Sequence, residues 1–178
     1  MRGRDDRQVA EYEYIMDHVR EGLRILFVGY NPSIRSSETG HHYANPTNKF
    51  YRILHEAGFT SRLVKPEEDG ELLAMGFGFT NIVARPTVAA ADITPEEYRE
   101  GRRILQEKLA LYRPQVACFV GKGVYEQYSG RKGMGWGSQL PPVTPGIVEY
   151  VCPSSSGLVR MKLEEMVEIY KGIHVYLS

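Results

Sequence analysis

Two asparagines stand at comparable places in this chain, each at the end of a short apolar run. Asn31 follows residues 25–30 (ILFVGY), and Asn81 follows residues 76–80 (GFGFT). An amide side chain can orient a water molecule but cannot deprotonate it. A reaction at such a site therefore needs a good leaving group or a strongly electrophilic centre.

The turn that contains Asn31 is rigid by composition. Gly29 lets the backbone pass close to a neighbouring group, and Pro32 keeps Asn31 extended rather than helical. The preceding apolar run is typical of a fully buried strand, and in open parallel sheets ligands bind at the carboxyl ends of the strands. An ordinary Asn-Pro turn that closes a strand has the same residues, so this segment alone leaves both interpretations open.

A second candidate segment, Gly121-Lys122-Gly123, lies between a predicted strand and a predicted helix. It lacks the G-x-x-x-x-G-K-[ST] spacing, so we do not expect it to bind a nucleoside triphosphate. A lysine and free amides at a helix N-terminus could hold a backbone phosphate, and a solvated turn explains the same residues about equally well.

Histidines and serines supply two further patterns. His41 and His42 are adjacent, so on an extended loop they point in opposite directions, and with no third ligand nearby we expect no metal site. Residues 154–156 are three consecutive serines without a G-x-S-x-G elbow or an acid–base partner. Short hydroxyls with exposed amides suit contact with phosphate better than nucleophilic attack.

The composition is that of a globular protein, with 178 residues, 42% of them hydrophobic and 25% charged. Lys plus Arg and Asp plus Glu both number 22, and this balance argues mildly against a nucleic-acid partner unless basic residues form a local patch. Two isolated cysteines, Cys118 and Cys152, cannot form a four-thiolate zinc or iron–sulfur site. We expect buried thiols and no cofactor.

We expect neither a membrane-spanning segment nor a secretory signal in this sequence. No apolar run approaches the ~20 residues that span a bilayer. The N-terminus leads into charged residues rather than the apolar core of a secretory signal. We therefore expect a cytoplasmic protein with no membrane partner.

The elements that position these residues alternate between strand and helix, which predicts an α/β fold. We expect a three-layer α/β/α sandwich with a central, mainly parallel four-stranded sheet. Residues 1–22 are interpreted as an N-terminal helical extension and residues 23–178 as a single domain. Strands are predicted at 24–30, 76–83, 116–120 and 147–151, helices at 7–21, 46–57, 66–76, 95–112, 122–128 and 159–171, and loops at 33–45 and 129–146.

Six blocks of sequence occur in a recognisable order over about residues 23–172. Together they resemble the mismatch-specific uracil/thymine-DNA glycosylase family, which is the Mug / thymine-DNA glycosylase branch of the uracil-DNA glycosylase superfamily. No single block is decisive, but their common order is a strong signal. The blocks are Gly29-Tyr30-Asn31-Pro32, Thr39-Gly40-His41-His42-Tyr43, Asn48-x-Phe50-Tyr51 with Ala57-Gly58-Phe59, Thr80-Asn81-Ile82-Val83-x-Arg85-Pro86-Thr87, Gly121-Lys122-x-x-Tyr125-Glu126 and Pro153-Ser154-Ser155-Ser156-Gly157-Leu158.

The resemblance implies a role for each matching position. Asn31 would hold the attacking water against C1′ of a flipped nucleotide, and Asn81 would support the water or the base. Gly29, Tyr30 and Tyr43 would form the base pocket, with main-chain amides on the pyrimidine carbonyls and the ring of Tyr43 stacked on the base. The implied DNA contacts are Ser154, Ser155, Ser156, Gly157, Leu158, Lys122 and Arg160, with Leu158 entering the stack that the base has left.

An amide-based site fits this chemistry. Cleavage of an N-glycosidic bond passes through an oxocarbenium-like sugar, for which ordinary glycosidases use two carboxylates. Uracil is a far better leaving group than a sugar alkoxide, because its anion is delocalised over two carbonyls. Backbone donors aimed at that anion can replace the general acid. The base must first leave the stack, which costs least where it is mispaired.

Two positions depart from the family pattern: Tyr30 replaces the usual isoleucine of the first block, and Ser33 replaces its second glycine. The bulk of Tyr30 close to the pocket favours uracil over thymine. We expect a monofunctional, metal-independent and monomeric DNA glycosylase that acts on mismatched or damaged pyrimidines in double-stranded DNA, at the first step of base excision repair. It would associate with the nucleoid when bound to DNA.

Two other functions remain open. A protein that binds damaged or abasic DNA with little or no turnover would have the same residues. A small-molecule α/β enzyme that acts on a free nucleoside or nucleotide is the other alternative. Leu158 would have no purpose in such an enzyme, whereas a wedge for duplex DNA needs it.

Overall fold

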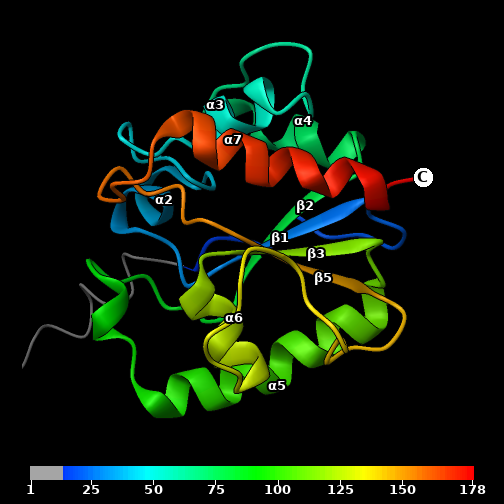
Figure 1. Ribbon diagram of the computed structural model, residues 1–178. Coiled ribbons are helices and arrows are strands. Elements are labelled where there is room, and N and C mark those ends of the chain that lie inside the picture. The colour runs from blue at the N-terminus through cyan, green and yellow to red at the C-terminus, as the bar shows by residue number, and fades with distance from the viewer. Residues whose placement is uncertain (1–13) are drawn as a thin grey trace, which may run out of the picture.

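The structure is a computed structural model that describes residues 14–178. It contains one five-stranded sheet in the order β2-β1-β3-β5-β4 (Figure 1). Four strands are parallel and the fifth, β4, pairs antiparallel with β5 at the edge. The predicted parallel sheet is confirmed, with one two-residue strand added inside the predicted loop 129–146. The strands are β1 (Ile25–Gly29), β2 (Phe77–Asn81), β3 (Val116–Val120), β4 (Gly137–Ser138) and β5 (Val148–Cys152).

Helices cover both faces of the sheet, which confirms the three-layer sandwich (Figure 1). The central strands are buried on both sides: Ile25 and Phe27 pack into one core and Leu26 and Val28 into the other. Their sequences are therefore continuously apolar rather than alternating. One face carries α3 (Phe50–Glu56), α4 (Asp69–Ala74) and α7 (Leu163–Lys171), and the other carries α5 (Pro95–Tyr112) and α6 (Lys122–Ser129).

The longest helix begins where the sequence predicts. The hydroxyl of Thr94 accepts a hydrogen bond from Glu97 N, and Glu97 Oε1 accepts one from Thr94 N, which completes the capping box at the start of α5. Both cysteines are buried and free, as predicted. The remaining helical segments are α2 (Ile34–Thr39) and the 3₁₀ turns η1 (Pro66–Glu68), η2 (Ala90–Asp92) and η3 (Gly172–Tyr176).

The predicted N-terminal helix is wrong over residues 14–21, which are not helical; residues 7–13 lie outside the described residues. His18 instead pairs antiparallel with Phe79, and the two residues exchange both backbone hydrogen bonds at 2.9 Å. The outer edge of β2 has backbone N–H and C=O groups that no other strand in residues 14–178 pairs, and His18 binds to them. Because Gly78 has no side chain, the carbonyl of His18 can approach the backbone of β2 closely. The division of the chain at residue 22 stays a prediction.

A short helix, α2, occupies part of the predicted loop 33–45. The side chain of Ser33 caps its first turn by accepting from Ser36 N at 3.0 Å. Gly40 ends it in the left-handed conformation, with φ of 74°. Its serine-rich sequence has no apolar stripe, so only these two end signals could have predicted it.

Candidate functional site

The carboxyl ends of β1, β2, β3 and β5 surround a cleft of about 490 Å³. Polar turns that follow the strands meet there, as predicted for a parallel sheet. The cleft lining includes ten of the predicted site residues but not Lys122 or Arg160. The ten are Gly29, Tyr30, Asn31, Tyr43, Asn81, Ser154, Ser155, Ser156, Gly157 and Leu158.

The amide group of Asn31 has a single possible orientation. Its nitrogen donates to the carbonyl of Arg85 at 2.7 Å and to the hydroxyl of Thr87 at 2.8 Å. The hydroxyl of Thr87 donates in turn to the carbonyl of Ala89 at 2.8 Å, so towards Asn31 it can only accept. Both amide hydrogens are thus used by protein, and Oδ1 stays available as an acceptor in the cleft.

Asn81 and Gly29 are partners in the register of β1 and β2. A Cβ at Gly29 would lie 2.6 Å from Oδ1 of Asn81 and 3.4 Å from the hydroxyl of Tyr43. The amide of Asn81 and the hydroxyl of Tyr43 therefore lie over the bare backbone of Gly29. Glycine is needed at this position because any side chain would displace Asn81.

Tyr43 forms one wall of the cleft. Its ring stacks on Phe50 with centroids 4.0 Å apart and planes 11° apart. Its backbone has a φ of 53°, in the left-handed region that bulky residues seldom adopt. Its hydroxyl is buried with no hydrogen-bond partner among the described residues, and burial raises the pKa of the phenol far above its usual value.

Tyr30 lines the cleft, and its ring extends towards α6. Its hydroxyl lies against Gly123 and its ring against Gly121, where a Cβ would be 3.4 Å away. The ring thus packs in the core between the sheet and α6, on the face opposite to Tyr43. Burial, together with nearby Glu126, raises the pKa of Tyr30. Tyr30 still lines the cleft, so the preference for uracil over thymine stays a prediction.

The serine-rich loop is closely packed and carries its own hydrogen bonds. Ser154 Oγ accepts from Ser156 N at 3.3 Å, and Ser156 Oγ accepts from Leu158 N at 3.2 Å. Gly157 lies so close to Thr47 that a Cβ would be 2.8 Å from its side chain and carbonyl. The hydroxyl of Ser155 is buried and has no partner among the described residues. The loop presents Leu158 at its tip, 93% exposed.

Lys122 and Arg160 lie beside the cleft rather than in it. The ammonium of Lys122 is 4.2 Å from the ring centroid of Trp136, and the preceding Gly121 is close to Ser154. Arg160 is exposed two residues beyond Leu158. Within residues 14–178, neither cation has an acidic partner at ion-pair distance, nor do Arg35 and Lys49, which adjoin lining residues.

The lining of the cleft is uncharged at neutral pH. Among the described residues that form it there is no Asp, Glu, Lys or Arg. Its one histidine, His42, has its pKa lowered to about 4, because burial outweighs the hydrogen bond from its Nε2 to the carbonyl of Met16. The arrangement can orient a water molecule and accept a neutral or anionic ring, but it offers no carboxylate base and no amine nucleophile.

The two adjacent histidines are held apart, as expected for an extended loop. His41 Nδ1 lies 3.0 Å from a carboxylate oxygen of Asp69, whereas His42 bonds to Met16. Across residues 14–178, no group of three His, Cys, Asp or Glu side chains could hold a metal ion. In the same residues no helix combines the length and apolar character needed to cross a membrane.

Several lining residues were missed by sequence reasoning. Thr87 accepts a hydrogen bond from the side chain of Asn31. The sequence does not predict this contact, because it is made where Ser33 and Thr87 pair in a β-bridge. Ser36, on the unpredicted α2, accepts from Ala44 N at 3.1 Å and so supports the loop of Tyr43. The apolar residues Val88–Ala90 also line the cleft. Only a prediction of the β1–β2 register could have placed Thr87 and Val88–Ala90 at the cleft.

Comparison with known proteins gives two findings. The family model described as "Uracil DNA glycosylase superfamily" matches residues 16–173. The fold is similar to the solution NMR structure of a proposed uracil DNA glycosylase from Methanosarcina acetivorans, with 21% sequence identity and a TM-score of 0.59. That match covers 92% of this chain and 98% of the other. At this identity the structural match supports the fold alone.

Proposed function

Because the chain belongs to the uracil DNA glycosylase superfamily, we propose that it removes uracil opposite guanine from double-stranded DNA. The further assignment to the mismatch-specific uracil/thymine branch rests on the ordered blocks of the sequence. In this proposal a flipped deoxyuridine enters the cleft and the products are free uracil and an abasic site. The enzyme acts as a monomer in the cytoplasm, as a first step of base excision repair.

The fixed amide of Asn31 is the observation that carries the proposal. Its nitrogen donates to Arg85 and Thr87, so its Oδ1 can accept a hydrogen bond from water. As the C1′–N1 bond breaks, its electron pair moves to N1 of uracil, and the oriented water attacks the cationic C1′. The water then loses a proton to solvent, and the released uracil anion takes one up from solvent. Asn31 positions this water without acting as a base.

Main-chain donors stabilise the departing uracil anion. Tyr43 N makes no hydrogen bond to any described residue, although the neighbouring amides of His42 and Ala44 both do. A free amide in an uncharged lining is suited to a pyrimidine carbonyl on which negative charge develops. The oxocarbenium charge on the sugar is balanced by the DNA phosphates, since the described lining has no carboxylate.

The uncharged lining also supports monofunctional hydrolysis. An enzyme that cuts the DNA strand through an imine needs an amine nucleophile at C1′. Within the described residues, the cleft lining contains no lysine. The reaction therefore ends at the abasic site.

The rim of the cleft supports duplex DNA as the substrate. Among the described residues, Lys122 and Arg160 have no acidic partner and lie beside the serine loop. A local basic patch of this kind supports contact with DNA phosphates although the net charge of the chain is zero. The exposed side chain of Leu158 is suited to fill the gap left in a base stack. A free nucleoside would use neither feature.

Excision on labelled duplexes tests the proposal. Duplexes with G:U, G:T and A:U pairs are incubated with excess protein and treated with alkali, which cleaves at abasic sites. We expect cleavage at G:U, and a loss of about a hundredfold in Asn31→Ala, the size of effect typical of a lost positioning contact. Gln106→Ala, on the exposed surface of α5, should match the wild type.

Each other outcome has a definite meaning. Binding of every duplex without cleavage supports the alternative, a damage-binding protein without turnover. Cleavage at G:U that survives Asn31→Ala contradicts the proposed role of Asn31 and makes Asn81 the first candidate. The G:T duplex decides whether the cleft admits thymine.

A further inference from the structure

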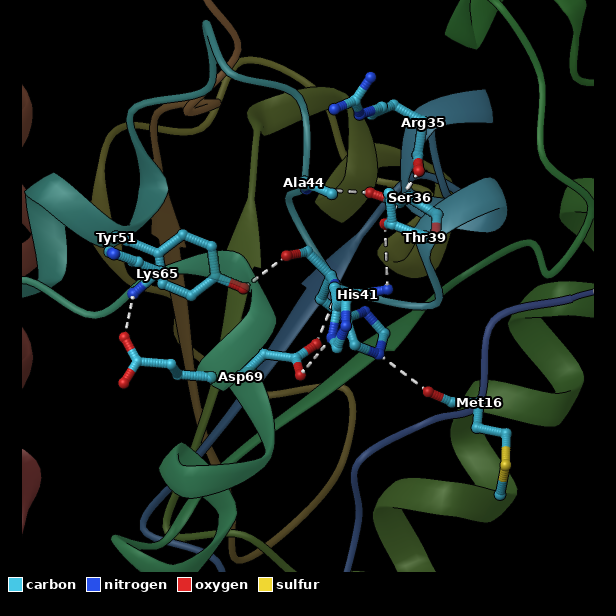
Figure 2. Close-up of polar contacts among 11 residues, drawn as sticks. Met16, Arg35, Ser36, Thr39, His41, Ala44, Tyr51, Lys65 and Asp69 are labelled. Carbon is cyan, nitrogen blue, oxygen red and sulfur yellow. Dashed lines mark hydrogen bonds and ion pairs between the residues drawn. The ribbon is translucent and has the colours of Figure 1, made fainter.

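The segment His41–Ala44 is held in one conformation by side chains from distant parts of the chain. Figure 2 shows Ser36, Tyr51 and Asp69 directed at this segment from three different elements. The hydroxyl of Tyr51 donates to the carbonyl of His42, and Ser36 Oγ accepts from Ala44 N. The third contact, from Asp69, is the one that the proposed reaction does not explain.

Asp69 is a buried carboxylate, only 3% exposed, at the start of α4. One of its oxygens accepts from the backbone N–H of His42 at 2.8 Å. The other lies 3.0 Å from Nδ1 of the half-buried His41. A carboxylate taken out of water needs such partners, so both of its oxygens are directed to this one segment.

These contacts account for every backbone N–H of the segment except one. His41 N donates to the hydroxyl of Thr39 at 3.4 Å, His42 N donates to Asp69, and Ala44 N donates to Ser36. Tyr43 N has no such partner in the described residues. Tyr43 is also the residue with positive φ, a conformation that persists only where its surroundings impose it.

We propose that Asp69 is a positioning residue for the leaving base: its carboxylate fixes His41 and His42 so that Tyr43 N–H faces the cleft. This inference rests on the proposed function, in which that amide stabilises the departing uracil anion. Asp69 does not touch the substrate. Its effect passes through the backbone of His42 to the neighbouring amide of Tyr43.

The test compares two leaving groups. In 5-fluorouracil the fluorine withdraws electrons, so its anion is more stable and depends less on a stabilising amide than that of uracil. Loss of an oxyanion donor should therefore slow excision of uracil more than excision of 5-fluorouracil. General damage to the fold would slow both equally.

Single-turnover rates on G:U and G:5-fluorouracil duplexes are measured for wild type and variants. In Asp69→Ala we expect the uracil rate to fall on the order of tenfold to a hundredfold, and the 5-fluorouracil rate to fall several-fold less. Asp69→Asn keeps one oxygen for His42 N and should show a smaller loss with the same selectivity. Glu71→Ala removes a nearby surface carboxylate paired with Arg62 and should change neither rate.

Equal losses on the two bases in Asp69→Ala, or no loss at all, would overturn the inference. If Asp69→Ala does not fold, the ratio of the two rates in Asp69→Asn decides in its place, and an unchanged ratio rejects the proposal. If the wild-type protein cuts neither duplex, the proposed function itself is rejected. If the wild type cuts both duplexes and Asp69→Ala cuts them at the same rates, only this inference is rejected.

Discussion

The side-chain nitrogen of Asn31 lies 2.8 Å from the hydroxyl of Thr87, which itself donates to the carbonyl of Ala89. Asn31 donates to Thr87, and Thr87 donates to Ala89. If the oxygen and nitrogen of the Asn31 amide were exchanged, the first of these hydrogen bonds would be lost, so the amide has one orientation. Position 31 lies after β1 and position 87 lies after β2. The orientation of the Asn31 amide is therefore fixed by the pairing of the segments that follow two strands, rather than by the Asn-Pro turn alone.

Replacement of Thr87 by valine should loosen Asn31 without changing the shape of its surroundings. One of the two acceptors of the Asn31 amide is lost, at a cost of about 1–2 kcal/mol, which corresponds to about 5- to 30-fold in the rate of excision. Single-turnover excision of uracil from a G:U duplex measures this. Thr87→Ser keeps the hydroxyl and should retain most of the rate; equal activity in all three proteins would contradict the role of Thr87.

Gly29→Ala should impair the site while the fold survives. The new methyl group would lie 2.6 Å from Oδ1 of Asn81, so the amide of Asn81 has to move out of place. We expect excision to fall about a hundredfold, since small misplacements at a reacting centre have effects of that size. The cost in unfolding free energy should stay at about 1 kcal/mol, because the displaced atom ends a flexible side chain.

The matched control for this substitution is Gly135→Ala. Gly135 is exposed, and a Cβ there would meet no heavy atom within 4 Å. Excision and urea denaturation are measured on both variants. A Gly29→Ala protein as active as Gly135→Ala would show that Asn81 does not need its observed position.

The parts of the fold that could be predicted from the sequence are those fixed by local patterns. The apolar run of β1 is buried on both faces, and the capping box of Thr94 starts α5, as predicted. The segment around His18 could not be predicted, because its extended conformation depends on the unpaired edge of β2. Its apolar spacing alone resembled a helix.

The candidate site shows the same limit. The sequence predicts that Asn31 and Asn81 stand at the ends of two strands whose polar turns meet along one edge of the sheet, and both residues line the cleft. It cannot show which face of the sheet a side chain takes beyond a strand end. Tyr30 lines the cleft as predicted, but the packing of its ring against Gly121 and Gly123 could not be read from the sequence.

Two cations beside the serine loop, the half-buried Lys122 and the exposed Arg160, should contribute separately to the salt dependence of DNA binding. Lys122 and Arg160 have no acidic partner among the described residues, so each is free to neutralise one phosphate. Removal of either by alanine should reduce the slope of log affinity against log salt concentration by about 1, across all duplex sequences. Binding is measured with Asn31→Ala protein, which leaves the duplex intact.

A paired cation supplies the control for these measurements. Lys171 lies on α7 and forms an ion pair with Glu168 at 3.4 Å. Its replacement by alanine should leave the salt slope unchanged. If Lys122→Ala and Arg160→Ala also leave it unchanged, the DNA does not cross the surface beside the serine loop.

The stability of the protein should depend on pH through His42. Burial lowers its pKa from 6.5 to about 4, so between these values the unfolded chain binds a proton that the folded protein does not. The contribution to stability is complete above pH 6.5 and is lost as the pH falls towards 4, with a limit of about 3 kcal/mol. Gln in place of His42 can still donate to Met16 but cannot titrate. Urea denaturation at pH 7 and pH 5 should therefore show a smaller decrease for His42→Gln than for wild type, and equal decreases would exclude His42 as the source.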